Sequence, residues 1–123
     1  MARKSSGGRY KKFRKKKLFE RTGQTRTVKL GKGKKKGMRG MGGRIKTVLL
    51  SANTANVLDK KTGKCKIVAI KKVIETPANK FLARQNVLIK GAIIETEIGN
   101  ARITNRPSQE SFVNAVLVSE KKE

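Results

Sequence analysis

Positive charge is concentrated in the first third of this 123-residue chain. Residues 1–47 hold 19 of the 32 Lys and Arg residues and a single acid, Glu20, for a net charge of +18. Residues 48–123 hold the other 13 bases and seven acids, which leaves +6 of the total charge of +24. A segment with so much like charge cannot fold compactly alone, because its charges repel one another. We therefore expect a polyanion as the partner of this chain.

The sequence divides into two parts near residue 47. Residues 1–47 contain nine of the twelve glycines and few apolar residues. We expect this part to be an irregular basic extension, with at most a weakly periodic helix over residues 10–21. Residues 48–123 contain enough apolar residues for one small domain of marginal size. The two expected parts are therefore a basic extension over 1–47 and a globular domain over 48–123.

Short apolar runs separated by turns predict strands after residue 44. Residues 65–74 are rich in β-branched side chains, which favours a strand there. Residues 92–98 alternate between a mostly apolar and a mostly acidic face, which predicts a strand. Its mostly apolar face consists of Ala92, Ile94, Thr96 and Ile98. Further strands are expected at 45–50, 57–58, 87–89, 101–105 and 112–118, and turns at 53–56, 59–63 and 99–100.

One short helix is expected between these strands. Thr76 is a suitable cap and Pro77 a suitable first helical residue for a helix over residues 78–84. The predicted fold class is mainly β, a small barrel of about six short strands with at most one short helix. Closure into a barrel removes the exposed edges that a small sheet would otherwise present.

The residues that most often carry catalysis and metal binding are scarce. The chain has no His, and its single Cys65 can neither form an internal disulfide nor anchor a zinc site alone. We expect Cys65 to be a small buried hydrophobe at a strand start. Glu95 and Glu97 share a strand face, but simple alternation with a solvated face explains them. The glycine-rich run 40–43 lacks the Lys-Ser/Thr ending of a phosphate-binding P-loop. We therefore expect no enzyme activity, no cofactor, no metal and no small-molecule substrate.

Membrane association and secretion are not favoured by the sequence. No apolar run approaches the roughly 20 residues of a membrane span, and no apolar stretch follows the basic N-terminus as in a signal peptide. Phe13, Leu18 and Phe19 are too few to anchor a basic helix on a lipid surface. With a single cysteine, the composition fits a reducing interior, and we expect a cytoplasmic protein.

The basic runs of the extension have three possible interpretations: phosphate-backbone binding, a solvated or targeting tail, and attraction to anionic membranes. Arginines are scattered among the lysines, which favours bidentate contacts with phosphate. Tyr10 and Phe13 lie between bases and could stack on unpaired bases or anchor the extension on its own barrel. Charge alone does not decide between RNA and DNA. A long irregular basic arm suits folded RNA, while a general DNA- or chromatin-compacting protein is the alternative.

Several short blocks, in order and spacing, resemble a known family. The chain is similar to the small-subunit ribosomal protein S-eight-e family, in its shorter archaeal form. The blocks that carry this resemblance are Gly7–Arg9, Gly42–Lys46, Ala52–Val57, Pro77–Asn79, Ala83–Asn86, Ile89–Thr96, Ala101–Pro107 and Val113–Leu117.

The resemblance implies a barrel-like domain with a basic extension embedded in ribosomal RNA. It implies a structural constituent of the small ribosomal subunit, located in the ribosome beside neighbouring ribosomal proteins. The expected RNA-binding residues are Arg3, Lys4, Gly7, Gly8, Arg9, Tyr10, Lys11, Lys12, Arg14, Lys15, Lys16, Lys17, Arg21, Arg39, Gly42, Gly43, Arg44, Lys46, Lys90 and Gly91.

The chain departs from the pattern of the family at three positions. Ser108 and Ser111 stand where the family usually has glycine, and a turn with positive φ would be strained there. Arg44 follows the glycine pair where the family usually has Asn. We expect Arg44 to alter local contacts and to leave the binding mode unchanged.

Overall fold

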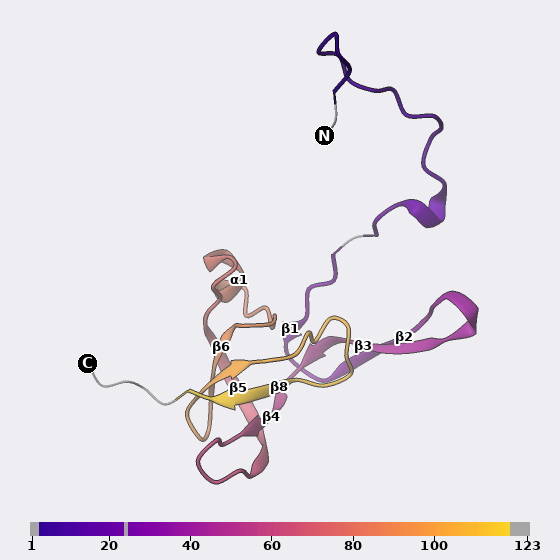
Figure 1. Ribbon diagram of the computed structural model, residues 1–123. Coiled ribbons are helices and arrows are strands. Elements are labelled where there is room, and N and C mark those ends of the chain that lie inside the picture. The colour runs from indigo at the N-terminus through magenta and orange to yellow at the C-terminus, as the bar shows by residue number, and fades with distance from the viewer. Residues whose placement is uncertain (1–2, 24, 119–123) are drawn as a thin grey trace.

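A computed structural model describes residues 3–23 and 25–118. An extended N-terminal arm and a long hairpin both project from a small barrel (Figure 1). The elements in chain order are η1 (Leu18–Glu20), β1 (Lys29–Leu30), β2 (Lys34–Arg39), η2 (Met41–Gly43), β3 (Ile45–Ala52), β4 (Thr54–Leu58), β5 (Cys65–Glu75), α1 (Lys80–Arg84), β6 (Ile93–Thr96), β7 (Asn100–Ile103) and β8 (Asn114–Leu117).

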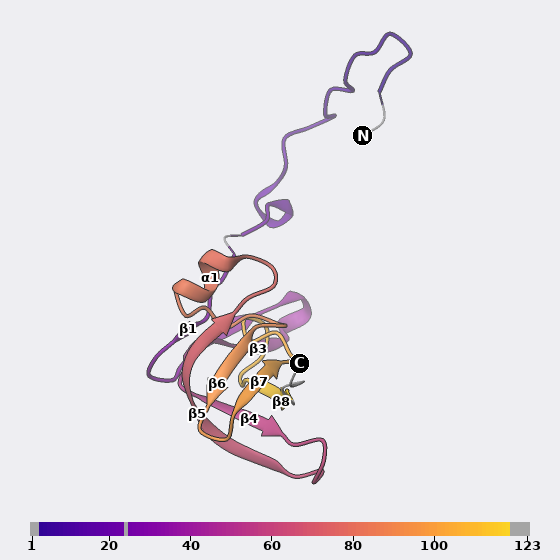
Figure 2. The same ribbon diagram turned by 90° about the vertical axis from the view of Figure 1, so that its left-hand side faces the viewer.

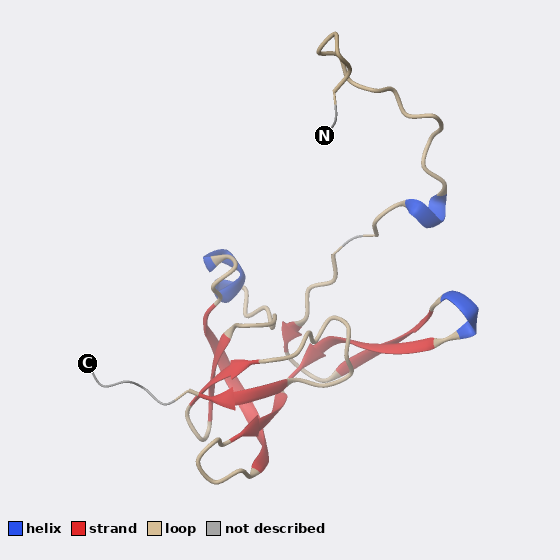
Figure 3. Ribbon diagram, viewed as in Figure 1, coloured by secondary structure: helices blue, strands red, loops and turns tan. Residues whose placement is uncertain are grey.

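Five strands close the barrel in the order β4-β5-β6-β7-β8, and a parallel pairing of β4 with β8 completes it. Strands dominate the structure and α1 is short (Figure 3). The predicted small barrel is therefore confirmed. The strands outside the barrel form a separate sheet with the order β1-β3-β2.

The core fills the barrel with aliphatic side chains. Ile94, Leu88 and Ile103 are at most 1% exposed, and Ala92 is fully buried beside them. The predicted inward face of residues 92–98 is confirmed for Ala92, which precedes β6, and for Ile94 and Thr96 in β6, whereas Ile98 is 46% exposed. Ile98 lies outside the core because Glu97 and Ile98 form the turn. The hydrogen bonds between Thr96 and Gly99 close this turn.

The turn before β7 is thus shifted by two residues from the expected Gly99-Asn100. Gly99 still supplies a positive φ of 140°, while β7 already begins at Asn100. The expected turn over residues 53–56 is also wrong, because β4 begins at Thr54 and pairs with β5 from its first residue. The expected strand at 87–89 shrinks to a single bridge between Val87 and Lys29.

The predicted strand over 65–74 is confirmed as β5, and bulges set its inward face. Val68 and Ile70 are buried, so simple alternation would bury Lys72 next. The register shifts between Ile70 and Lys72, which places Val73 in the core instead. Cys65 is exposed, so its expected burial is wrong. It lies at the first position of β5, on the face opposite Val68 and Ile70.

A short segment joins the arm to the barrel. Val28 is fully buried in the core, and its carbonyl accepts a hydrogen bond from Leu88 N–H at 2.7 Å. Leu30 N–H donates to the carbonyl of Asn86, and β1 pairs in parallel with the end of β3. The expected irregular course to residue 44 is therefore wrong for Lys29–Leu30 and Lys34–Arg39, and β3 runs across the expected boundary at residue 47.

The short helix begins later than predicted. Asn79 is its N-cap, and its side-chain oxygen accepts from Phe81 N–H at 2.9 Å. Thr76 and Pro77 instead open a turn that Asn79 N–H closes onto the Thr76 carbonyl. No helix within the described residues is long and apolar enough to cross a membrane.

Candidate nucleic-acid interface

The N-terminal arm, residues 3–23, extends away from the barrel (Figure 2). All its hydrogen bonds are local, such as Lys4 N–H to Gly8 O and Arg3 Nη1 to Gly7 O. The possible helix over 10–21 is reduced to the single turn η1, since the closely spaced like charges of its Lys and Arg side chains oppose a longer one. The predicted binding residues from Arg3 to Arg21 all lie exposed on this arm.

One acid interrupts the positive charge of the arm. Both Glu20 carboxylate oxygens accept from Arg14, at 2.6 and 2.7 Å, and Lys17 N–H donates to the same carboxylate. The Arg14 guanidinium, and then the Lys17 amide, lower the pKa of Glu20. Arg14 is therefore engaged with Glu20 in the free chain, while no other arm cation is in an ion pair among the described residues.

The aromatic side chains of the arm are not packed on the barrel. Phe13 is fully exposed and Tyr10 is 64% exposed, with the Lys4 ammonium 5.8 Å from the Tyr10 ring centre. Phe19 is 80% exposed, with Lys17 over its ring. The expected alternative of anchoring on the barrel is wrong for Tyr10 and Phe13. Both rings are free to stack on another molecule.

The second basic group lies at the tip of the β2–β3 hairpin. Arg39 pairs with Ile45 at the end of the ladder, and η2 forms the turn. Gly42 and Gly43 have φ of 70° and 78°, a conformation that glycine adopts without strain. Met41 is 99% exposed at this tip. The fold thus presents Arg39, Gly42, Gly43, Arg44 and Lys46 on a projecting element.

Lys90 and Gly91 lie apart from the N-terminal arm and from the hairpin, in the turn that precedes β6. Gly91 has a φ of 84° and its N–H donates to Ile103 O at 2.8 Å. Lys90 is exposed on the barrel. The predicted binding residues are therefore distributed over three places: the arm, the hairpin tip and the barrel surface.

A hollow beside the outer half of the hairpin is lined by the predicted residues Arg39 and Lys46 and by residues that the sequence prediction missed. Its volume is about 270 Å³, and its lining includes Arg26, Lys46, Ser108 and Gln109. Arg26 Nη1 contacts the sulfur of Met38, the register partner of Lys46. No acidic residue lines this hollow among those that the structure describes. In the sequence, Arg26 is one more base of the basic extension over 1–47, and nothing in the sequence pattern indicates that Ser108 and Gln109 lie beside it.

The loop over residues 106–111 is held in place beside this hollow. Asn105 Nδ2 donates to Glu110 and to the Phe112 carbonyl, and its oxygen accepts from Asn114 N–H. Leu49 N–H donates to the carbonyl of Pro107, which fixes the loop against β3. Neither serine of this loop has a positive φ, so the expected strain at Ser108 and Ser111 does not occur.

Comparisons with known proteins agree on one family. Residues 1–118 match the sequence model of the family described as ribosomal protein S8e. The chain is 45% identical to the small ribosomal subunit protein eS8 of Methanococcus aeolicus, over 96% of this chain and 93% of that protein. It is also 45% identical to the proteins of the same name from Methanocorpusculum labreanum and Methanosphaerula palustris, each over 94% of this chain and 93% of the relative.

Proposed function

The chain belongs to the ribosomal protein S8e family, and on that premise we propose that it binds and stabilises ribosomal RNA. It is a structural constituent of the small ribosomal subunit and works through the basic N-terminal arm, the basic β2–β3 hairpin and the barrel that carries them. Family membership supports the place in the ribosome, and we place the protein in the cytoplasm. The proposal assigns the chain no catalytic step.

The observation that carries this proposal is the positive charge of the N-terminal arm and the hairpin, of which only Arg14 is in an ion pair among the described residues. The arm and the hairpin are exposed and rich in Lys and Arg, and Glu20 is their only acid. Lys and Arg release condensed counterions when they neutralise phosphates, and the gain in affinity follows the number of contacts. A long arm without a core can follow closely packed phosphates, and it takes its final shape from the RNA.

Each part of the interface has a separate chemical role. Arginines bind phosphate oxygens in a bidentate manner, and the exposed rings of Tyr10 and Phe13 can stack on unpaired bases. The hollow lined by Arg26, Arg39, Lys46 and Ser108 offers three cations and a hydroxyl to phosphate. The barrel holds the origins of arm and hairpin at a fixed spacing.

Crosslinking in native small subunits tests the proposal. Ultraviolet crosslinking followed by sequencing of the attached nucleic acid is expected to recover defined ribosomal RNA segments joined to peptides from residues 3–46. A general DNA-compacting protein is the competing function. In that case the chain would be stripped from small subunits at moderate salt, and its crosslinks would be scattered or would contain DNA.

A further inference from the structure

A row of mostly apolar side chains runs over the outside of the barrel. Cys65 on β5 pairs with Leu58 on β4, and Leu58 pairs with Val116 on β8. The row continues through Arg102 on β7 to Ile93 on β6. We call these five residues the outer row. None is buried, although the solvated face of an antiparallel sheet is normally polar.

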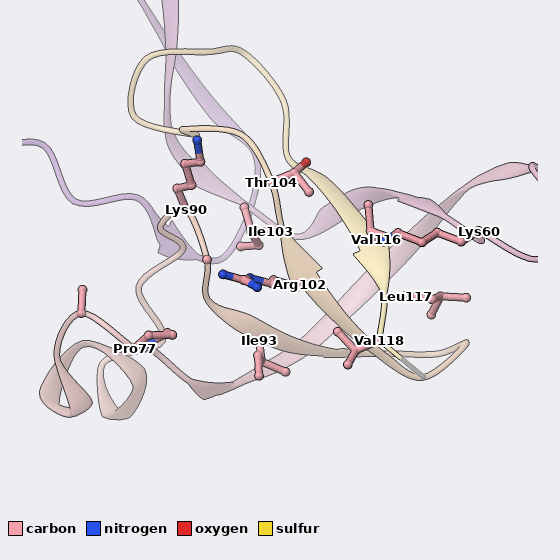
Figure 4. A pocket seen from close by; sticks show the side chains of 12 residues that line it. Lys60, Pro77, Lys90, Ile93, Arg102, Ile103, Thr104, Val116, Leu117 and Val118 are labelled. Carbon is pink, nitrogen blue, oxygen red and sulfur yellow. The ribbon is translucent and has the colours of Figure 1, made fainter. Parts of the chain in front are cut away.

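Two adjoining hollows lie along the outer row. The larger, of about 920 Å³, is lined by Ile93, Arg102, Val116 and Val118, and Arg102 lies near its middle (Figure 4). The smaller, of about 340 Å³, is lined by Leu58, Cys65 and Ile67, and Ile67 is 78% exposed. Val116 lines both hollows and joins them. A contiguous apolar surface of this kind marks an interaction site, whereas single exposed apolar residues do not.

The charged side chains of the described residues that line the hollows all have one sign. Lys60, Lys90 and Arg102 line the larger hollow, and Lys66 lines the smaller one. Within residues 3–23 and 25–118, no acidic residue lines either hollow, and the only cations in ion pairs are those of Arg14 and Lys72. The surface therefore combines aliphatic contact area with cations that have no carboxylate partner in the described part of the chain.

We propose that the outer row is a docking surface for a peptide segment of a neighbouring ribosomal protein. Aliphatic side chains of that segment fill the two hollows beside Val116. Its Asp or Glu carboxylates, or a terminal carboxylate, pair with Lys60, Lys90 and Arg102. This inference rests on the proposed function, because the ribosome supplies the neighbour.

The chemistry of the hollows favours a peptide over the two other occupants. Proteins read single-stranded RNA by stacking bases on aromatic rings, and none of the described residues that line the two hollows is aromatic. β-Branched and other aliphatic side chains pack instead against aliphatic side chains. A second copy of this chain is opposed by repulsion, because each copy carries a net charge of +24.

Photocrosslinking in assembled small subunits tests the proposal with the full chain. Val116 is replaced by photoreactive p-benzoylphenylalanine, which its partial exposure accommodates. A matched variant carries the same group in place of Met41, which is 99% exposed at the hairpin tip. We expect position 116 to crosslink to a protein peptide that contains aliphatic and acidic residues, and position 41 to crosslink to ribosomal RNA.

The single thiol gives a second measurement that needs no substitution. Cys65 lies exposed in the outer row of the free chain, so it is expected to react rapidly with N-ethylmaleimide. In assembled subunits the rate is expected to fall by at least an order of magnitude. A crosslink from position 116 to RNA or to a second copy would overturn the inference. So would the absence of a crosslink together with an unchanged Cys65 rate. Loss of the RNA crosslink at position 41 alone would instead count against the proposed function.

Discussion

Glu20 is the residue whose removal most simply alters the arm. Glu20→Gln removes the carboxylate that holds Arg14 and frees this guanidinium for phosphate. We expect tighter RNA binding and a slope of log affinity against log salt that is steeper by about one contact, or about 0.9. Arg14→Gln in the same background should return the slope to the wild-type value. An unchanged slope in Glu20→Gln would show that Arg14 contacts no phosphate.

The pH dependence of that pair follows from the same contacts. Because Arg14 and the Lys17 amide lower the pKa of Glu20, the pair is present at neutral pH. It is lost only as the pH falls through that lowered pKa. Wild-type RNA affinity should therefore be flat between pH 6 and pH 8, as measured by filter binding at constant salt. A change of affinity across that interval would contradict the assignment.

Asn86 combines two functions in one residue of the barrel. Its φ is 51°, and its side-chain oxygen accepts from Val73 N–H at 3.1 Å, beside the bulges of β5. Asn86→Gly keeps the backbone conformation and leaves this partly buried N–H unpaired, which should cost about 1–3 kcal/mol of unfolding free energy. Asn86→Ala should cost about 1–2 kcal/mol more, because alanine is strained at positive φ. Urea unfolding of both variants measures these losses, and equal stability of Asn86→Gly and wild type would contradict them.

At the scale of elements, two N-terminal deletions test the segment that joins the arm to the barrel, because one ends before this segment and the other removes it. Deleting residues 1–26 leaves Val28 and β1 in place, so the unfolding temperature of the barrel should change little. Deleting residues 1–31 removes the buried Val28 and the hydrogen bonds that Leu88 and Leu30 make there. That loss should destabilise the barrel by several kcal/mol. Similar melting curves for both deletions would show that this segment does not belong to the core.

The hairpin should contribute to RNA binding through charge at its tip. Arg39→Gln with Arg44→Gln is expected to make the salt slope shallower by about 1.8. Lys61→Gln with Lys64→Gln removes the same charge from the β4–β5 loop and is the matched control. We expect the control to leave the slope nearly unchanged, and equal effects of the two pairs would argue against a specific role for the tip.

Local patterns predicted the elements that depend on local sequence. The β-branched run became β5 and the alternation at Ala92, Ile94 and Thr96 became the buried face of β6. The pairing of β1 with β3 was not predictable, because β1 has only two residues and is formed by contacts across the chain. The bulges of β5 and the position of Ser108 beside Arg26 likewise arise from tertiary packing. The charge pattern predicted which segments are exposed, but not how they are anchored.

At the scale of the whole molecule, the charge divides differently from what the sequence suggested. The barrel core extends back to Val28, and β3 continues from the hairpin into the barrel region. The cations of residues 3–23 are therefore on an arm that extends from the barrel, while those of residues 34–46 are on a β-paired hairpin. In the proposed function, the extended arm and the hairpin, which the β2–β3 ladder holds, contact RNA at two different places, and the barrel carries both.

The salt dependence of ribosomal RNA affinity tests the central claim most directly, when it is measured for the full chain and for a chain without residues 1–26. If roughly ten phosphates are contacted, the full chain should give a slope near −9 for log affinity against log salt, and somewhat less on single strands. The truncated chain should stay folded and lose at least half of that slope. Slopes near −2 for both chains would show that the arm is merely solvated, and would contradict the account.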